Sequence, residues 1–332
     1  MRLKSRHCWI FYPLFLLIFG CIIENNNREW KNVSNGLPEN SSISTLTISG
    51  SRIFAITGQE EMYASDDNGI NWFQVGDGLP DDLHIVTMTT IGSTIYAGTE
   101  GTRDSGIYNS VDNGKTWSEI NTGIPKHDFG FIPWCSAIVS SANDIYAATD
   151  LGLFITVTGG NSWSQVQGGV PQDQQFVAMD AIGSILVAAS PDSGVYFSYN
   201  YGTSWDPINQ GLIADTTDSE VTVHSDITSI VLTDSAFYSL ANEGVYGMLN
   251  NGTNWDLIYN KDKYGQVYAI ASYDENVFIG GGRGIFYSND YGKNWEPYFE
   301  NWEFGGIESL LTTDEYIFCG TGRGVYRTDL PD

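Results

Sequence analysis

The chain of 332 residues has few basic side chains: 15 lysines and arginines stand against 40 aspartates and glutamates, which gives a formal net charge of −25. A surface this acidic argues against nucleic acids and anionic lipid head groups as partners, because their charge repels it. Long apolar runs are also scarce. Beyond the first 20 residues no segment is long and apolar enough to span a membrane, and no long amphipathic helical pattern occurs.

The exception is the N-terminus, where three basic residues precede an apolar run over residues 9–19. This is the layout of an export signal, and the run is short for a permanent membrane helix. The stretch "LIFGC", which ends at Cys21, resembles the lipobox of bacterial lipoproteins. The resemblance implies a signal peptide of lipoprotein type over 1–20, lipidation of Cys21, a polar tether over 21–28, and a lipid-anchored protein of the bacterial cell envelope (outer membrane or cell surface). An ordinary cleaved secretory signal is the alternative.

Internal repeats organise the rest of the chain. Tryptophans recur every 40 to 50 residues, each after a similar stretch such as "SDDNGINW", "SVDNGKTW" or "SNDYGKNW". A second shared element follows several of them and reads "NGLP" at 35–38, "DGLP" at 77–80, "TGIP" at 122–125 and "GGVP" at 168–171. The repeated tryptophans are Trp72, Trp117, Trp163, Trp205, Trp255 and Trp295, and Trp30 extends the series backwards.

Each repeat contains four short segments of alternating β-branched and aromatic residues, separated by glycine and Asn/Asp turns. Four strands in a unit of this length indicate a propeller blade. Six complete units end at Trp295, and a seventh has only three strands before the chain stops. The segment 29–34 supplies the missing outer strand. We therefore predict an all-β, seven-bladed β-propeller over 29–332, with the N-terminal strand completing the last blade and removing open sheet edges.

Cysteine is also rare. Cys135 and Cys319 are the two that remain within the predicted propeller. The repeat map puts them in well-separated blades, so we expect two buried thiols that pack as small apolar residues.

The repeated stretch, Ser/Thr-x-Asp-x-Gly-x-Thr-Trp, resembles the Asp-box or BNR repeat. This repeat is found in sialidases, sortilin-like receptors, xyloglucan-degrading enzymes and photosystem II assembly factors. The resemblance extends over nearly all of the chain after the signal and implies a propeller. The matching positions are Ser65, Asp67, Gly69, Trp72, Ser110, Asp112, Gly114, Trp117, Ser288, Asp290, Gly292 and Trp295, with Trp163, Trp205 and Trp255 in copies where Thr158, Asn200 and Asn250 replace the aspartate.

The residue types of the box indicate a structural role. Asp, Asn, Ser and Thr side chains accept hydrogen bonds from turn amides, glycine permits positive φ, and tryptophan provides a large apolar anchor between small sheets. A catalytic group would not be needed six times, nor would it tolerate replacement by Thr or Asn. A calcium loop would need a later glutamate ligand, which "DDNG" at 66–69 lacks. We expect no metal and no cofactor.

The loops that depart most from the repeat are expected on the opposite rim, where propellers generally bind their ligands. They carry the histidines and the aromatic residues that lie outside the boxes, beside carboxylates, which could hold a sugar or a peptide strand. Packing at the channel mouth is the alternative role for each residue. The candidate ligand-binding residues are His84, His127, Asp128, Phe131, Trp134, His224, Tyr264, Arg283, Trp302, Glu303 and Arg323.

Two enzyme classes compete with a binding role. Sialidases hold their substrate with three arginines, whereas Arg283 and Arg323 lie in repeated "GRG" turns that suggest repeat structure instead. Xyloglucan-degrading enzymes resemble the chain in their boxes but use two propellers and a pair of carboxylates. Photosystem II assembly factors are single seven-bladed propellers, often lipid-anchored, but their partner surface is arginine-rich.

We therefore expect a monomeric, non-catalytic, lipid-anchored scaffold that binds a protein or a carbohydrate through its variable loops. Its contact with the membrane is expected through the lipid anchor only, and no nucleic acid is expected. A glycoside hydrolase is the alternative, endo-glucanase-like before exo-sialidase.

Overall fold

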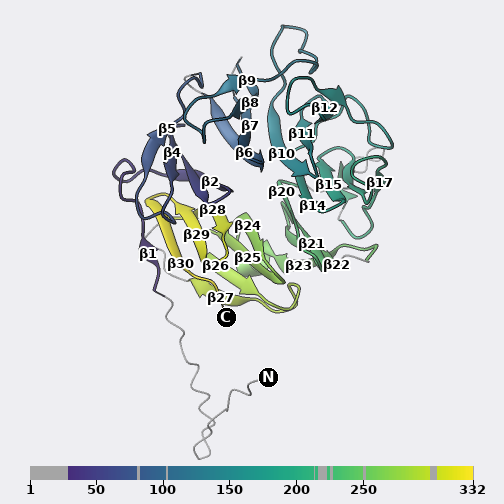
Figure 1. Cartoon of the computed structure of the whole chain (residues 1–332). Coiled ribbons are helices and arrows are strands. Elements are labelled where there is room, and N and C mark those ends of the chain that lie inside the picture. Colours follow the sequence, from purple (N-terminus) through teal and green to yellow (C-terminus); the bar gives the residue numbers. More distant parts are fainter. Residues whose placement is uncertain are drawn as a thin grey trace, which may run out of the picture.

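Seven four-stranded antiparallel sheets surround a common axis (Figure 1), which confirms the predicted seven-bladed β-propeller. This computed structural model describes residues 29–80, 83–101, 104–212, 214–215, 223–224, 227–249, 252–299 and 305–331; of 214–215, 223–224 and 263–264 it describes the backbone alone. The first strands of consecutive blades contact one another around the axis, and those of the first and last blades meet as well. The ring is therefore closed.

The strands of blades 1 to 4 follow one another in sequence, from the axis outwards. They are β2 (Ile43–Ser49), β3 (Arg52–Thr57), β4 (Met62–Ser65) and β5 (Phe73–Val75); β6 (His84–Ile91), β7 (Thr94–Glu100), β8 (Gly106–Ser110) and β9 (Ser118–Glu119); β10 (Cys135–Ser141), β11 (Asp144–Thr149), β12 (Gly152–Thr156) and β13 (Ser164–Gln165); β14 (Ala178–Ile182), β15 (Ile185–Ser190), β16 (Gly194–Ser198) and β17 (Asp206–Pro207).

Blades 5 and 6 repeat this order, and blade 7 takes its outer strand from the N-terminus. The strands are β20 (Ser229–Leu232), β21 (Ala236–Ala241), β22 (Gly244–Leu249) and β23 (Asp256–Asn260); β24 (Val267–Tyr273), β25 (Asn276–Gly281), β26 (Gly284–Ser288) and β27 (Glu296–Phe299); β28 (Ile307–Thr312), β29 (Tyr316–Thr321), β30 (Gly324–Asp329) and β1 (Lys31–Asn32).

Two additions interrupt the repeat. A short hairpin of β18 (Ala214–Asp215) and β19 (Val223–His224) lies between blades 4 and 5, and the one-turn helix α1 (Lys261–Tyr264) follows blade 5. The side chain of Asn260 caps α1 by accepting a hydrogen bond from the Asp262 amide at 2.8 Å. Within the described ranges, no helix has the length and hydropathy needed to cross a membrane.

The N-terminal strand closes the ring as predicted. Lys31 faces Arg327 and Asn32 faces Tyr326 in the β1–β30 pairing, and the Val33 amide donates to the Val325 carbonyl at 2.9 Å. Because β1 takes the place of a fourth strand, it begins on the face where third strands end, which is the face of the box turns. The described chain therefore begins and ends on that face.

The box turns are held by hydrogen bonds that their residue pattern predicts. In the best copy the Gly114 amide donates to Ser110 Oγ at 2.8 Å, and the Thr116 amide and hydroxyl donate to the Asp112 carboxylate at 2.8 and 2.7 Å. The two bonds from Thr116, with a third from the Ser110 hydroxyl, lower the pKa of Asp112 to about 2. The copies with Thr158 and Asn200 keep equivalent bonds to the residue four positions later, at 3.2 and 3.0 Å. The box is a structural device.

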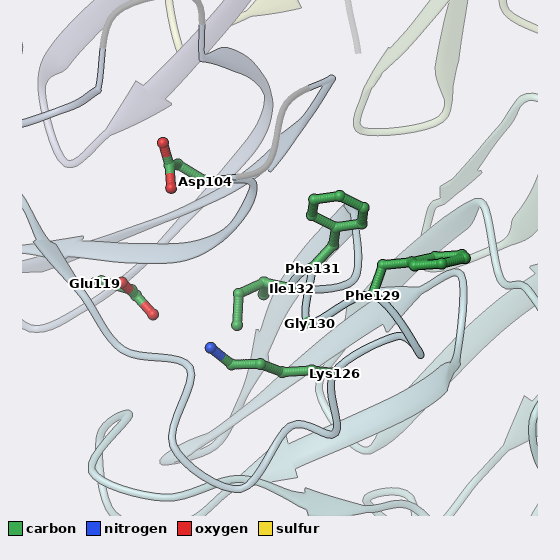
Figure 2. Close-up of a pocket in the computed structure, with 7 residues that line it drawn as sticks. All are labelled: Asp104, Glu119, Lys126, Phe129, Gly130, Phe131 and Ile132. Atoms are coloured by element: carbon green, nitrogen blue, oxygen red, sulfur yellow. The ribbon is translucent and has the colours of Figure 1, made fainter.

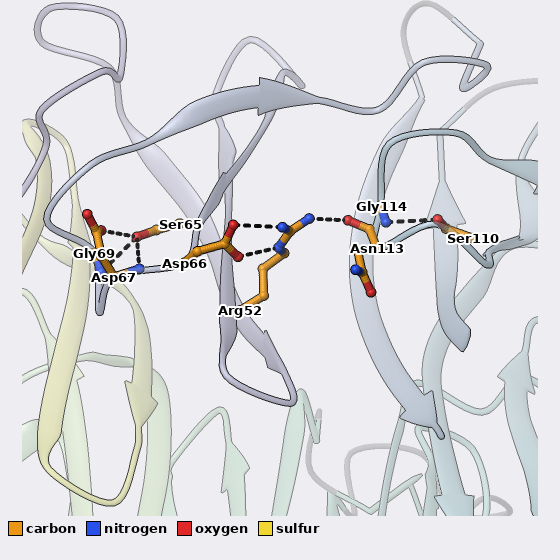
Figure 3. A network of polar contacts seen from close by, with 8 residues as sticks. All are labelled: Arg52, Ser65, Asp66, Asp67, Gly69, Ser110, Asn113 and Gly114. Atoms are coloured by element: carbon orange, nitrogen blue, oxygen red, sulfur yellow. Dashed lines mark hydrogen bonds and ion pairs between the residues drawn. The ribbon is translucent and has the colours of Figure 1, made fainter. Parts of the chain in front are cut away.

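The box turns also join neighbouring blades. Arg52 of blade 1 pairs with the Asp66 carboxylate at 2.6 Å, and its Nη1 donates to the carbonyl oxygen of Asn113 in the box of blade 2 at 2.5 Å (Figure 3). Gly114 lies directly over Phe54 of blade 1: a Cβ at this glycine would approach Phe54 Cε1 to 2.7 Å. The Phe54 ring of the neighbouring blade thus leaves no room for a side chain at this position.

A second link between blades explains the "NGLP" element. The backbone amide of a box tryptophan donates to a carbonyl in the element of the preceding blade, and we call this contact the clasp. It joins Trp72 to Asn35 at 2.8 Å, Trp117 to Asp77 at 3.0 Å, Trp163 to Thr122, Trp205 to Gly168 and Trp255 to Gln210, the last three at 2.8 Å. Several indole nitrogens reinforce it; that of Trp163 donates to the Ile120 carbonyl at 2.7 Å. Box and element are two halves of one contact.

Both cysteines are buried thiols in different blades, as expected. Cys135 begins β10 in blade 3 and Cys319 lies in β29 in blade 7, each with 0% of its surface exposed. Burial raises the pKa of both thiols, so neither forms a thiolate near neutral pH.

One inner strand carries an ionisable group beside the axis. The Asp180 carboxylate in β14 accepts hydrogen bonds from the Ala181 amide and, across the blade boundary, from the Leu232 amide of β20, both at 2.7 Å. The side chain is half-buried, and loss of hydration raises its pKa to about 6, because the two hydrogen bonds offset only part of that cost.

We expect the clasp to tolerate no side chain at its glycine. Gly123 has a φ of +93°, and a Cβ there would lie 2.2 Å from the Trp163 carbonyl oxygen. Gly123→Ala should lower the free energy of unfolding by about 3 kcal/mol, measured by urea denaturation, because backbone strain and overlap add. Gly183→Ala is the matched control: φ is +56° but nothing lies within 4 Å of its Cβ, so about 1 kcal/mol is expected. Equal losses would contradict the clasp.

Asp180 should make stability fall as the pH rises. Its ordinary pKa is 3.8 and its folded value is about 6, so between these values the folded chain holds a proton that the unfolded chain has lost. Raising the pH from 4 to 7 should cost about 2 kcal/mol of unfolding free energy through this residue. Asp180→Asn should remove that component. Urea denaturation of both proteins at several pH values measures the difference, and parallel curves would show the assignment to be wrong.

Candidate functional site

The two faces of the ring are built from different connections. Box turns and the turns between first and second strands lie on one face, here the box face. The connections between blades and the turns between second and third strands lie on the other, here the variable rim. This division follows from the antiparallel order of each blade. The variable rim contains the loops that depart most from the repeat.

Residues 125–134, here the finger loop, join blade 2 to blade 3 on the variable rim. A tight turn shapes it: the Gly130 amide donates to the His127 carbonyl at 2.7 Å, and the His127 amide donates to the Phe131 carbonyl at 2.9 Å. The turn places Phe129 at the tip with 88% of its surface exposed, and Trp134 at the base is 45% exposed.

A hydrogen bond between the side chains of His127 and Asp150 fastens the finger loop to blade 3. His127 Nε2 lies 3.0 Å from Asp150 Oδ2, in the turn between β11 and β12, and both side chains are half-buried. The Asp150 amide also donates to the Trp134 carbonyl at 3.4 Å. The second carboxylate oxygen, Oδ1, is buried without a hydrogen-bond partner among the described residues. The loop is therefore held at its base, while its tip faces solvent.

A pocket of about 290 Å³ lies beneath the finger loop. Asp104 from the turn after β7 and Glu119 from β9 line it, together with five residues of the finger loop: Lys126, Phe129, Gly130, Phe131 and Ile132. In Figure 2 the Glu119 carboxylate and the Lys126 ammonium point toward the same space, with the Phe131 ring above them and Asp104 across the mouth. Two carboxylates, one ammonium and an apolar wall can both hydrogen-bond and pack against a ligand.

Tyr108 supports the floor of this pocket. Its hydroxyl donates to the Asp104 carbonyl at 2.6 Å. Burial raises its pKa to about 12, with smaller contributions from the carboxylates of Glu119 and Asp104. The hydroxyl therefore remains a neutral hydrogen-bond donor at any physiological pH.

Other predicted residues lie elsewhere on the variable rim. Arg283 and Arg323 are exposed in the turns that precede β26 and β30, and neither has an ion-pair partner among the described residues. His84 begins β6 opposite Glu100 and is half-buried. The structure thus joins His127, Phe131 and Trp134 in one site, with exposed Asp128 on the same loop, and leaves the two arginines and His84 outside it.

Several predicted residues lie outside the described residues: Cys21, with the signal and tether, and Trp302 and Glu303. For two more, only the backbone is described: His224 lies in β19 opposite Ala214, and Tyr264 ends α1. Within the described ranges, no three His, Cys, Asp or Glu side chains gather as a metal site would require.

Sequence reasoning missed three acidic residues of the site and two residues near the axis. Asp104, Glu119 and Asp150 come from different strands and turns, so no motif links them.

Tyr268 is the extra residue of a β-bulge at the start of β24, with 57% of its surface exposed. Glu308 holds the same position in β28 and accepts a hydrogen bond from Ser42 at 2.8 Å. The only available signal was their equivalent place in the repeat.

Comparisons with known proteins agree with this architecture. A profile described as BNR/Asp-box repeat matches residues 286–297, and one described as DUF6242 beta propeller domain matches residues 21–134. No curated protein matches the chain. These matches and the six box copies of the seven-bladed ring agree with the predicted Asp-box β-propeller.

Solved structures with the same fold include binding proteins and enzymes. YCF48 bound to D1 peptide is 18% identical, with a TM-score of 0.67 over 93% of this chain and 97% of that one. The extracellular domain of a hybrid two component system from B. thetaiotaomicron is 12% identical (TM-score 0.67; 92% and 40%). The GH74 xyloglucanase from Xanthomonas campestris is 17% identical (TM-score 0.61; 88% and 44%). This chain spans less than half of the last two. At these identities the likeness concerns the fold alone.

The hydrogen bond between His127 and Asp150 should control how firmly the finger loop is held. In His127→Ala the loop loses its link to Asp150, and chymotrypsin should cleave after Phe129 or Phe131 several times faster than in the unchanged protein. The melting temperature should change little, because the half-buried pair lies at the surface. His84→Ala, on the same rim but away from the loop, is the control. Equal cleavage rates in all three proteins would contradict a fastening role.

Proposed function

We propose that the protein is a non-catalytic binding module of the bacterial cell envelope, exported and lipid-anchored through Cys21. It recognises a peptide segment of a protein partner through the variable rim. The observation that carries this proposal is the finger loop: a loop fastened at its base that presents Phe129 to solvent above a pocket of mixed chemistry.

An aromatic side chain exposed to this extent has no role in the core, and water hydrates it poorly. Aromatic residues on rigid supports are typical anchors of protein interfaces, because little conformational entropy is lost when they are covered. The fastening of the finger loop by His127 and Asp150 supplies that rigidity. Phe129 and Trp134 would therefore contact the partner, while the pocket would hold one of its side chains.

The acidic surface supports a neutral or cationic partner segment. A net charge of −25 repels acidic peptides at long range and steers basic ones toward the ring. The structure of YCF48 with D1 peptide shows that a ring of this fold can hold a peptide. The arrangement on this chain is its own, because the finger loop belongs to a connection that departs from the repeat.

A glycoside hydrolase is the second candidate, and one observation favours it: Asp104 and Glu119 line the same pocket. Hydrolysis of a glycosidic bond uses a pair of carboxylates on either side of that bond. The xyloglucanase of the same fold supports the general possibility. The finger loop favours the peptide, since 88% of the Phe129 surface is exposed at its tip, as expected of an anchor for a partner surface.

The proposal is tested with the mature chain and a displayed peptide library. Peptides that bind should lose at least tenfold in affinity for a Phe129→Ala, Trp134→Ala double variant, because two aromatic contacts are removed. A Val111→Ser, Val157→Ser double variant is the matched control: it removes two exposed apolar side chains from the box face and should bind normally.

Three results would count against the proposal: an absence of binding peptides, equal affinity in both double variants, or product release from β-glucans or sialosides at enzymatic rates. The last would favour the hydrolase, and Asp104→Asn and Glu119→Gln should then each abolish product release.

A further inference from the structure

The box face carries a repeated pattern of exposed apolar side chains. Ten large apolar side chains are exposed among the described residues, and six of them lie in box turns of five consecutive blades. They are Ile70 in blade 1, Val111 in blade 2, Val157 in blade 3, Tyr199 and Tyr201 in blade 4, and Leu249 in blade 5, with exposed fractions between 47% and 73%. We call these six residues the apolar arc. Scattered apolar residues are normal on a surface, but an arc confined to one structural position is not.

The position explains why the arc points outwards. Val111, Val157, Tyr199 and Leu249 all occupy the second place of the box, next to the Ser, Thr or Met whose side chain is buried beneath the turn. The fold does not require an apolar side chain at this place, since the equivalent residues are Asp66, which pairs with Arg52, in blade 1 and Asn289 in blade 6. Apolar residues in four consecutive copies therefore require a reason outside the fold.

The charge of the first turns on the box face differs between blades 1 to 4 and blades 5 to 7. The turns between first and second strands lie on this face, and in blades 1 to 4 their residues are uncharged: 50–51, 92–93, 142–143 and 183–184. In blades 5 to 7 the same turns carry Asp234, Asp274, Glu275, Asp314 and Glu315. In blades 1 to 4 the box face thus combines the apolar arc with uncharged first turns. Its charged residues lie within the boxes (Asp66, Asp67, Asp112 and Lys115) or beside the turns (Arg52 and Asp144).

The N-terminus leaves the ring on this same face. β1 begins where the box of blade 7 would lie, and Trp30 takes the place of the box tryptophan, packing on Phe299 with ring centroids 4.9 Å apart. Seven residues lie between Cys21 and Glu29. The eight Cα–Cα steps span at most about 28 Å, so a lipid on Cys21 would hold the box face within that distance of the membrane surface. The variable rim would then face away from the membrane.

We propose that the apolar arc rests on an uncharged lipid surface and orients the ring, with blades 1 to 4 against the membrane and the variable rim turned outwards. This goes beyond the proposed function, from which it takes only the anchor at Cys21. Tyrosine, valine and leucine side chains gain by entering the interfacial region of a bilayer. The binding free energy that six side chains contribute is modest, but the tether raises the effective concentration of the lipid surface. Anionic lipids would oppose the contact because of the net charge.

The test uses the mature chain from Cys21 onwards, joined through that thiol to a maleimide lipid in phosphatidylcholine vesicles. The coupling is selective because Cys135 and Cys319 are buried. Hydrogen–deuterium exchange is then compared between coupled and uncoupled protein. Amides of the box turns at 110–117 and 156–163 should exchange several-fold more slowly in the coupled protein, and those of the finger loop should be unchanged. Equal exchange on both faces, or protection of the finger loop, would overturn the proposal.

A triple variant, Val111→Ser, Val157→Ser and Leu249→Ser, should lose the protection while keeping its melting temperature, because all three side chains are exposed. Phe129→Ser with Trp134→Ser on the variable rim should keep it. Vesicles with an equal share of phosphatidylglycerol should weaken the protection, and undiminished protection there would overturn the preference for an uncharged surface. Peptide binding by the rim is measured on the same vesicles. Its absence would count against the proposed function alone, whereas retained protection in the triple variant would count against the apolar arc alone.

Discussion

The hydrogen bond from the amide of a box tryptophan to the preceding blade is the contact on which the ring depends. A blade of four short strands is too small to bury its own faces, so its stability comes from its neighbours. The clasp links adjacent blades at their outer edges, where the blades lie farthest apart. At the axis, adjacent blades are held by packing between their first strands. At the junction of blades 5 and 6, where the "NGLP" element is missing, α1 follows the outer strand and the Trp295 indole still donates to the Ile258 carbonyl at 3.0 Å.

The box remains recognisable because its hydrogen bonds depend on geometry more than on charge. A hydroxyl in the first place accepts the glycine amide, and an oxygen in the third place accepts the amide four residues on. Asp112, Thr158 and Asn200 all supply that oxygen. The carboxylate forms the strongest bonds and the hydroxyl the weakest. A repeat can therefore lose its aspartate and still close its turn, which is why drifting copies predict structure and not chemistry.

The sequence was sufficient for the architecture and insufficient for the site. Seven blades and the closure by residues 29–34 follow from the tryptophan period, because each repeat folds by the same local rules. The pairing of His127 with Asp150, and the meeting of Asp104 with Glu119 below the finger loop, arise between connections that share no pattern. Long-range contacts of this kind depend on how blades are placed around the axis. The histidine and the aromatic residues were found because they break the repeat, whereas their acidic partners lie within it.

The two faces of the ring differ in how much of their sequence can vary without changing the fold. On the variable rim whole loops are unconstrained, and the chain uses one of them to raise Phe129 above the ring. On the box face the turns are fixed, and only single side chains such as Val111 and Tyr199 remain to be chosen. Closure of the ring by β1 brings the N-terminus to the box face whatever those side chains are. With the proposed anchor at Cys21, the fixed turns would face the membrane and the adaptable loops would face the surroundings. A partner would then be selected by the loops without any change to the proposed contact with lipid.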